Sequence, residues 1–470
     1  MIPAPKKINI DNEKVYFSMT YTTKGFNSSV QGALRAMSDY CDRVFFKSMQ
    51  RDDEKADVIC VLDEASDKDS YEIIAENGKI NIKAQSTDAL GYAFATLLQA
   101  MDKDENGIYV NKMNVSDFPG CDWRGLMLDI GRLFLPFQKL LNIIDLCWLY
   151  KVNKIQLHLS DSPSYTLPSD AFPKISKENG SYTKEEIALI RSYAKERGVM
   201  LVPEIDMPGH SLWLMECYPE TFGTNLVMCA EEKTFKALEI LIDEVIALFP
   251  DSPYIHLGGD EADINEWEKC DGCVAYMKEH DIPNVQALYS HYLKRVTDYV
   301  LSKDRIPIVW EGFAREYNHM ISKDVIVAEF ESLYQLAPEL IEDGFKVLNC
   351  SWKPLYVIPR SDKQWPAEVI LKTWDIFRWQ NWFEKSAASK QDIVVPNNSP
   401  VIGGQLCNWM DMFQRSFNNE LGWNESFELL RERITGFSEK IWNIDSTLNI
   451  EEFKASAAKT DKLLDKLLRK

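Results

Sequence analysis

The chain has 470 residues, of which 45% are apolar and 27% are charged, and its formal net charge is -19. This acidic balance argues against a nucleic-acid partner, because phosphate backbones are bound by basic surfaces. No apolar run approaches the roughly 18 residues that a membrane-spanning helix needs, so we expect no membrane partner.

The N-terminus lacks the apolar segment of a signal peptide, and the ten cysteines stand mostly alone in apolar segments, as free thiols do. We therefore expect a cytoplasmic protein, or a secreted or periplasmic one whose leader has been removed. Cys270 and Cys273 are the exception. Without a second ligand pair, C-x-x-C is a weak zinc signal, and we expect a turn that begins a helix there.

Residues 1–120 are predicted to form a small α+β domain. Within it, residues 71–84 predict a β-hairpin, because Asn77-Gly78 separates two alternating strands. Residues 86–101 begin with Ser86, a typical N-cap, and continue as an apolar helix.

From residue 121 to 422, short apolar strands alternate with longer helical segments, which indicates a parallel sheet covered on both faces. The eight strand candidates are 125–130, 154–160, 199–206, 254–260, 306–312, 325–330, 346–352 and 401–409. Eight such units predict a (β/α)8 TIM barrel. An open doubly wound sheet is the alternative, but no glycine-rich phosphate motif follows the first strand. The fifth and sixth strands lie too close together for a full helix between them.

Residues 423–470 are predicted to be helices that pack on the barrel. One face of the last helix carries Leu463, Leu464, Leu467 and Leu468. We expect this face to pack against the outside of the barrel, with a homodimer contact as the alternative.

In such a barrel the catalytic groups lie at the C-terminal ends of the strands. Acids, histidines and aromatic side chains gather there: His158, Asp161, Asp206, His210, Asp260, Glu261, Trp310, Phe330, Trp352, Tyr356, Trp409 and Asp411. Aromatic rings cover the apolar face of a sugar, carboxylates bind its hydroxyls, and a carboxylic acid protonates the leaving oxygen. The strand ends therefore predict a site that binds and cleaves a sugar.

Asp260 and Glu261 are adjacent, so both can face one site only where the chain leaves regular strand pairing. Gly258 and Gly259 permit this. A metal-dependent hydrolase is a competing interpretation. Because the chain has only six histidines and none forms a His-x-His pair, we expect neither a metal nor another cofactor.

The segment HLGGDE, residues 256–261, resembles the signature of glycoside hydrolase family 20, the β-N-acetylhexosaminidases. The resemblance extends to WRGLMLDIGRLFLP (123–136), SYTKEEIALIRSYAKERGVMLVPEIDMPGHS (181–211), LFPDSPYIHLGGDEADINEW (248–267) and VIGGQLCNWMDMF (401–413). It covers about residues 1–420, including the small N-terminal domain.

The resemblance implies an exo-acting retaining enzyme that removes terminal β-linked GlcNAc or GalNAc from an oligosaccharide or glycoconjugate. In this family the 2-acetamido oxygen of the substrate is the nucleophile and an oxazolinium intermediate forms. Glu261 would be the general acid and base, Asp260 would orient the acetamido group, and Tyr356 would bind its oxygen. An ionised neighbour is expected to raise the pKa of Glu261.

The resemblance also implies sugar-binding roles at the other matched positions: Arg124 for a hydroxyl, Asp411 for another, and Trp310, Phe330 and Trp409 as a box around the acetamido methyl. Phe330, Ser162 and Asp411 depart from the usual family residues, which leaves the choice between GlcNAc and GalNAc open. The alternative functions are a non-catalytic sugar-binding barrel and a family member that releases a disaccharide or a sulfated sugar.

Overall fold

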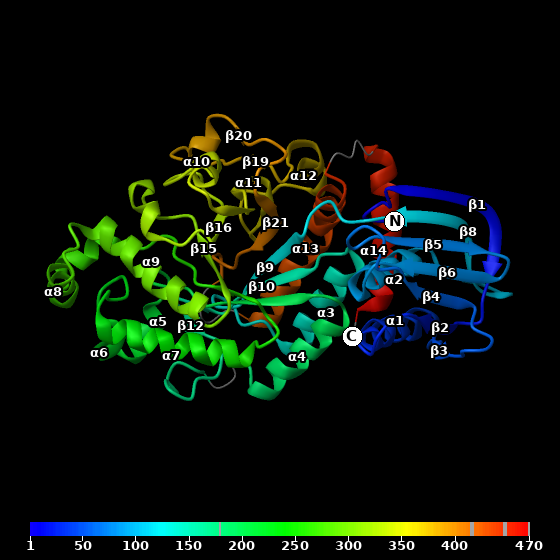
Figure 1. Ribbon diagram of the computed structural model, residues 1–470, viewed down its shortest axis with the longest axis horizontal. Coiled ribbons are helices and arrows are strands. Elements are labelled where there is room, and N and C mark those ends of the chain that lie inside the picture. The colour runs from blue at the N-terminus through cyan, green and yellow to red at the C-terminus, as the bar shows by residue number, and fades with distance from the viewer. Residues whose placement is uncertain (178–179, 414–417, 445–448, 469–470) are drawn as a thin grey trace.

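The computed structural model describes residues 1–177, 180–413, 418–444 and 449–468 (Figure 1). The N-terminal domain holds one mixed sheet. Its strands lie in the order β1 (Lys7–Tyr16), β8 (Gly107–Asp117), β5 (Tyr71–Glu76), β6 (Lys79–Ala84), β4 (Val58–Leu62), β2 (Thr20–Lys24) and β3 (Gln50–Arg51), and β7 (Asp102–Asp104) pairs with β8.

The predicted hairpin is confirmed. Strands β5 and β6 are antiparallel, Glu76 pairs with Lys79, and Asn77 and Gly78 both have positive φ, 51° and 73°. Two positive φ values in a two-residue loop are the geometry that an Asn-Gly turn favours.

Helices α1 (Val30–Phe45) and α2 (Thr87–Ala100) lie between the N-terminal sheet and the rest of the molecule (Figure 1). The side chain of Ser86 caps α2 by accepting the backbone N–H of Ala89, as its sequence predicts. A buried charge fixes α1 to the second domain, because Asp145 accepts hydrogen bonds from Arg43 at 2.7 Å and Arg197 at 2.8 Å.

The second domain is a closed barrel of eight parallel strands, which confirms the predicted fold class. Their order is β9 (Trp123–Asp129), β10 (Lys154–His158), β13 (Met200–Glu204), β14 (Tyr254–His256), β15 (Ile306–Trp310), β16 (Ile326–Glu329), β17 (Lys346–Asn349) and β21 (Val401–Asn408), and β21 pairs with β9 to close the ring. Every predicted strand is present, and the strands end up to four residues earlier than predicted.

Helices outside the barrel join consecutive strands: α3 (Phe137–Leu149), α4 (Lys184–Glu196), α7 (Glu232–Leu248), α9 (Val285–Ser302), α10 (Ala337–Glu342) and α12 (Ala367–Thr373). Between β15 and β16 there is only the 3-10 helix η2 (Arg315–Met320), which agrees with the short spacing in the sequence. Thr183 and Glu186 begin α4 with a reciprocal capping box.

The loops beyond the C-terminal ends of the strands carry short elements: β11 (Ser160–Asp161), β12 (Ser164–Tyr165), α5 (Leu212–Cys217), α6 (Pro219–Phe222), η1 (Ile264–Lys269), α8 (Asp271–Glu279), α11 (Trp352–Leu355), β18 (Tyr356–Val357), β19 (Arg378–Trp379), η3 (Ala387–Ser389) and β20 (Ile393–Val394). Helix α8 lies at the end of the molecule far from the N-terminal domain (Figure 1).

Two C-terminal helices complete the chain, α13 (Asn419–Trp442) and α14 (Ile450–Leu467). Helix α13 packs on α12 and the barrel, whereas α14 contacts α1 of the N-terminal domain and α3 of the barrel. Leu464 and Leu467 are buried in this contact. The leucine face therefore joins the two domains instead of covering the barrel alone. Within the described ranges, every helix is too short or too polar to cross a bilayer.

Candidate active site

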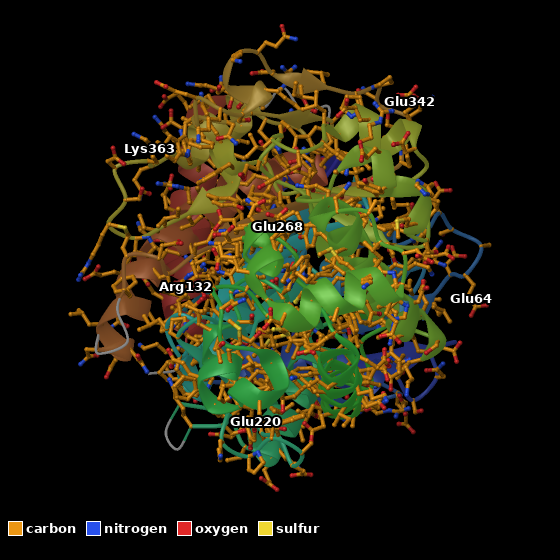
Figure 2. The ribbon with its side chains drawn as sticks, turned by 90° about the vertical axis from the view of Figure 1, so that its left-hand side faces the viewer. Glu64, Arg132, Glu220, Glu268, Glu342 and Lys363 are labelled. Carbon is orange, nitrogen blue, oxygen red and sulfur yellow. The ribbon has the colours of Figure 1, made fainter. Side chains whose placement is uncertain are left out.

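The two adjacent acids follow the shortest barrel strand, β14. Glu268 of η1, the next helix along the chain, is labelled in Figure 2. After His256 the chain leaves pairing through Gly258 and Gly259, which have φ values of 65° and 100°. A Cβ on Gly258 would lie 1.7 Å from Asp206 Oδ1. Only glycine, which has no Cβ, therefore lets the backbone come this close to the carboxylate. Gly259 N–H donates to the same oxygen at 3.0 Å.

Asp260 and Glu261 face the same site from different depths. Asp260 is 6% exposed, and its Oδ1 is buried with no hydrogen-bond partner among the described residues. The Glu261 side chain is 57% exposed, and its backbone has a left-handed φ of 48°. The pair therefore places one carboxylate in the floor of the site and the other at its rim.

Burial raises the pKa of Asp260, and the charge of Glu261 raises it further against the opposing charge of His210. The pKa of Glu261 is lowered, chiefly by its hydrogen bond with His210. This direction contradicts the sequence-based expectation of a raised value. The physical reason is that the hydrogen bond with His210, from another strand end, lowers the pKa more than burial raises it, and the charges of His210 and Arg132 lower it further.

His210, in the loop after β13, lies at the centre of the acids. Its Nδ1 is 3.5 Å from Asp161 Oδ1, and its Nε2 is 3.5 Å from Glu261 Oε2 and 3.8 Å from Asp260 Oδ2. Burial alone would lower the pKa of His210, but hydrogen bonds to Asp161 and Glu261 leave it well above its usual range. The surrounding carboxylates therefore favour the cationic form of the imidazole.

A second histidine connects the site to the barrel interior. His158 Nε2 is 2.9 Å from Asp161 Oδ2, and its Nδ1 is 2.8 Å from Glu204 Oε2. Glu204 also accepts the indole N–H of Trp310 at 2.9 Å. This chain of contacts fixes both the orientation of Asp161 and the plane of Trp310.

The predicted aromatic residues are brought together on one wall. The Trp310 ring centre lies 5.6 Å from that of Phe330 and 6.0 Å from that of Trp409. Tyr356 stacks on Phe330 at 6.4 Å with an interplanar angle of 3°, and it lies 6.1 Å from Trp409. Trp352 contacts both Phe330 and Tyr356. These five side chains, including all three predicted box residues, form the aromatic wall.

The structure does not bring Arg124 to this site, so the predicted role of Arg124 is wrong. Arg124 lies at the start of β9, and its guanidinium donates to the carbonyls of Cys121 and Lys151 and to the Tyr92 hydroxyl. The start of a parallel strand is at the opposite end of the barrel from the catalytic loops.

Arg132, three residues after β9 ends, is the arginine of the site (Figure 2). Its guanidinium lies 3.0 Å from Asp129, 3.0 Å from Asp161 and 3.8 Å from Asp411, and 5.0 Å from the ring centre of Trp409. The Asp411 side chain is 47% exposed and can reach a ligand beside Arg132. Like the acids, Arg132 lies beyond the C-terminal end of a barrel strand, so the same position in the fold identifies it.

Glu331 is a further functional candidate, which was not predicted from the sequence. It comes directly after the predicted residue Phe330, beyond the end of β16, and is 6% exposed. Burial and the charges of Glu261 and Asp260 raise its pKa to about 7. Its position just after the sixth strand is the signal that could have identified it.

Both domains of the chain match known family domains. The catalytic domain of glycosyl hydrolase family 20 matches residues 121–443, and domain 2 of the same family matches residues 1–118. The chain belongs to glycosyl hydrolase family 20.

Named relatives of this family 20 chain are β-hexosaminidases. A β-hexosaminidase of Vibrio furnissii is 28% identical over 329 residues, which are 62% of this chain and 53% of the relative. The β-hexosaminidase subunit alpha of Rattus norvegicus is 30% identical over 385 residues, 74% of this chain and 65% of the relative. The chain thus spans about half to two thirds of the length of these relatives.

Solved structures share the fold. An exo β-N-acetylglucosaminidase of Vibrio harveyi, in complex with N-acetylglucosamine, superposes with a TM-score of 0.83 at 21% identity, covering 99% of this chain and 77% of that one. A β-N-acetylhexosaminidase of Bacteroides fragilis gives 0.82 at 20% identity, covering 99% and 96%. The two-domain arrangement of the family 20 chain is therefore shared with these proteins.

Proposed function

We propose that the protein is an exo-acting retaining β-N-acetylhexosaminidase that removes terminal β-linked GlcNAc or GalNAc by substrate-assisted catalysis. The observation that carries this proposal is the buried Asp260 Oδ1, which has no hydrogen-bond partner in the described part of the chain, next to the rim carboxylate of Glu261. Family membership and the named β-hexosaminidase relatives support it.

In the first step, the acetamido carbonyl oxygen of the substrate attacks the anomeric carbon as the bond to the leaving oxygen breaks. Glu261 in its protonated form gives its proton to that leaving oxygen. The acetamido N–H donates to Asp260 Oδ1, and the carboxylate stabilises the positive charge that develops on the oxazolinium ring.

Tyr356 is suited to bind the acetamido oxygen as a donor. Burial raises the pKa of its phenol well above the usual range, which favours the protonated hydroxyl that can donate. The aromatic wall beside it, including Trp310, Phe330 and Trp409, gives the acetamido methyl and the apolar face of the sugar a dry contact surface.

In the second step, the Glu261 carboxylate takes a proton from water, and the oxygen of this water attacks the anomeric carbon. The bond from that carbon to the acetamido oxygen breaks, which restores the acetamido group and completes two inversions with net retention. The lowered pKa of Glu261 favours the ionised form that this step needs. A sugar above Glu261 removes water from the carboxyl and raises its pKa for the first step.

Hydroxyl recognition falls to the charged group around Arg132. Arg132, Asp161 and Asp411 lie together beside Trp409, so a ring that rests on the aromatic wall presents its hydroxyls to them. Charged partners of this kind discriminate strongly between sugars with and without a hydroxyl at one position.

The test is nitrophenol release from the β-N-acetylglucosaminide and the β-N-acetylgalactosaminide, with Glu261→Gln measured beside the native protein. Glu268→Gln is the matched control, because Glu268 is an exposed acid of the neighbouring η1 helix. Release by the native protein and Glu268→Gln, with collapse in Glu261→Gln, supports the proposal. No release from either sugar by folded native protein refutes it and favours the sugar-binding barrel.

A further inference from the structure

Three cysteine thiols meet outside the sugar site. Cys229 lies in the loop before α7, and Cys270 and Cys273 lie at the start of α8. The three sulfurs are all within 4.8 Å of one another, and Cys229 Sγ is 3.3 Å from Cys270 Sγ. Cys229 and Cys273 are buried, and Cys270 is half-buried.

The surrounding backbone is arranged to support charged sulfur. The backbone N–H of Ala230 donates to Cys273 Sγ at 3.3 Å, so the residue after one cysteine stabilises another. Cys270 is the residue that precedes the first turn of α8, which has nine residues, and the positive end of a helix favours an anion there.

We propose that Cys229, Cys270 and Cys273 bind a structural Zn²⁺ ion through three thiolates. Tetrahedral zinc with Zn–S bonds of about 2.3 Å places its sulfur ligands about 3.8 Å apart, which is within the spread of these three atoms. A C-x-x-C pair at a helix start with a third thiol from another loop is a donor set that favours zinc among the available divalent ions. Binding releases the thiol protons to solvent.

The fourth position would be taken by the Glu231 carboxylate, which lies outside the group of atoms within 4.8 Å of one another and would move toward the ion on binding. This side chain crosses the first turn of α8, because its Oε2 lies 2.6 Å from the point that a Cβ on Gly272 would occupy. It reaches Lys233 with its other oxygen at 3.0 Å. A larger residue than glycine between the two cysteines would displace it.

A disulfide explains the cluster less well than a metal. A disulfide joins two sulfurs and leaves the third without a role, whereas the structure brings all three into mutual reach.

The ion would join the two loops that carry catalytic groups. Cys229 ends the loop that contains His210, and Cys270 follows the segment that begins with Glu261. The same two segments are already linked by the indole N–H of Trp267, which donates to the carbonyl of Met228 at 2.8 Å. Zinc would fix the separation of His210 and Glu261 from outside the sugar site.

The experiment measures metal in the full-length chain purified under reducing conditions. We expect one zinc per chain in the native protein, retained after dialysis, and its loss in Cys229→Ser and Cys270→Ser. Cys217→Ser is the matched control, because Cys217 is a half-buried free cysteine outside the cluster, and it should keep its zinc. Glu231→Gln should bind zinc more weakly, and unchanged affinity would overturn the assignment of Glu231.

A second measurement needs no variant. Cobalt added to chelator-treated native protein should give the thiolate-to-cobalt charge-transfer band and the intense visible bands of tetrahedral cobalt, and zinc should abolish both. Zinc should also protect three thiols from alkylation. Folded, fully reduced native protein that binds neither metal, or a disulfide between two of these cysteines found by mass analysis, would overturn the proposal. Because metal content is measured without substrate, this result is independent of the hexosaminidase assay.

Discussion

His210 Nε2 lies 3.5 Å from Glu261 Oε2, which couples the loop after the third barrel strand to the acid at the end of the fourth. The two side chains come from residues with left-handed backbone, at φ 48° in each case. The charge of protonated His210 therefore influences the pKa of Glu261, which gives and takes a proton in the reaction.

Replacing His210 by Gln should move the pH–rate profile to higher pH. The charge of His210 lowers the pKa of both Glu261 and Asp260, so its removal raises both. Glu261 must be protonated as the general acid, so the alkaline limb moves up. Asp260 must be ionised to stabilise the oxazolinium, so the acid limb moves up too.

The measurement is kcat/KM against pH for the native protein and His210→Gln. His319→Gln is the control, because His319 is exposed on η2 and should leave both limbs in place. A profile of His210→Gln with unmoved or downshifted limbs contradicts the assignment of these charges.

Replacing Glu261 by Gln should cost more with poor leaving groups than with good ones. General acid catalysis is worth about 10²–10⁴-fold when the leaving oxygen needs a proton. A dinitrophenol leaves without that help, so the loss in its bond-breaking step should be much smaller than for an alkyl glycoside. Equal losses across a leaving-group series would show that Glu261 has another role.

The barrel is predictable from sequence because its strands are buried on both faces and read as short apolar runs. Their C-terminal ends then select Asp161, His210, Asp260 and Glu261 without any structure. The contacts between these charged side chains are not predictable in this way. The contact that lowers the pKa of Glu261 joins two loops whose relative position depends on the closed barrel.

Two pairs of residues show which features cannot be predicted from the sequence alone. Arg124 lies at the start of β9 and Arg132 lies just beyond its end, and only the direction and exact ends of the strand decide which one reaches the sugar site. Cys229 stands 41 residues before Cys270, so their contact depends on two loops folding back toward each other.

Arg132→Lys and Arg124→Lys should therefore fail in different ways. Lysine at position 132 keeps the charge but loses the planar fork that serves Asp129 and Asp161, so KM should rise about 10- to 100-fold. Lysine at position 124 loses donors to backbone carbonyls at the far end of the barrel and should lower thermal stability with little change in KM. Steady-state kinetics and thermal melting of both variants distinguish these effects. A large KM increase in Arg124→Lys would support the sugar-binding role that the sequence predicts for Arg124.

Gly258→Ala should destroy the site, whereas Gly78→Ala should only weaken the N-terminal hairpin. Both glycines have similar positive φ, 65° and 73°, so the backbone strain of an added Cβ is about 1–2 kcal/mol in each. At Gly78 no atom lies within 4 Å of that Cβ, but at Gly258 it would overlap Asp206 Oδ1 at 1.7 Å. Asp206 would have to move, together with the Gly259 N–H that it accepts, and Asp260 would move with them.

We expect a lower melting temperature in both variants and loss of nitrophenol release in Gly258→Ala alone. Activity retained in Gly258→Ala would mean that the two acids do not depend on the close approach of this turn to Asp206.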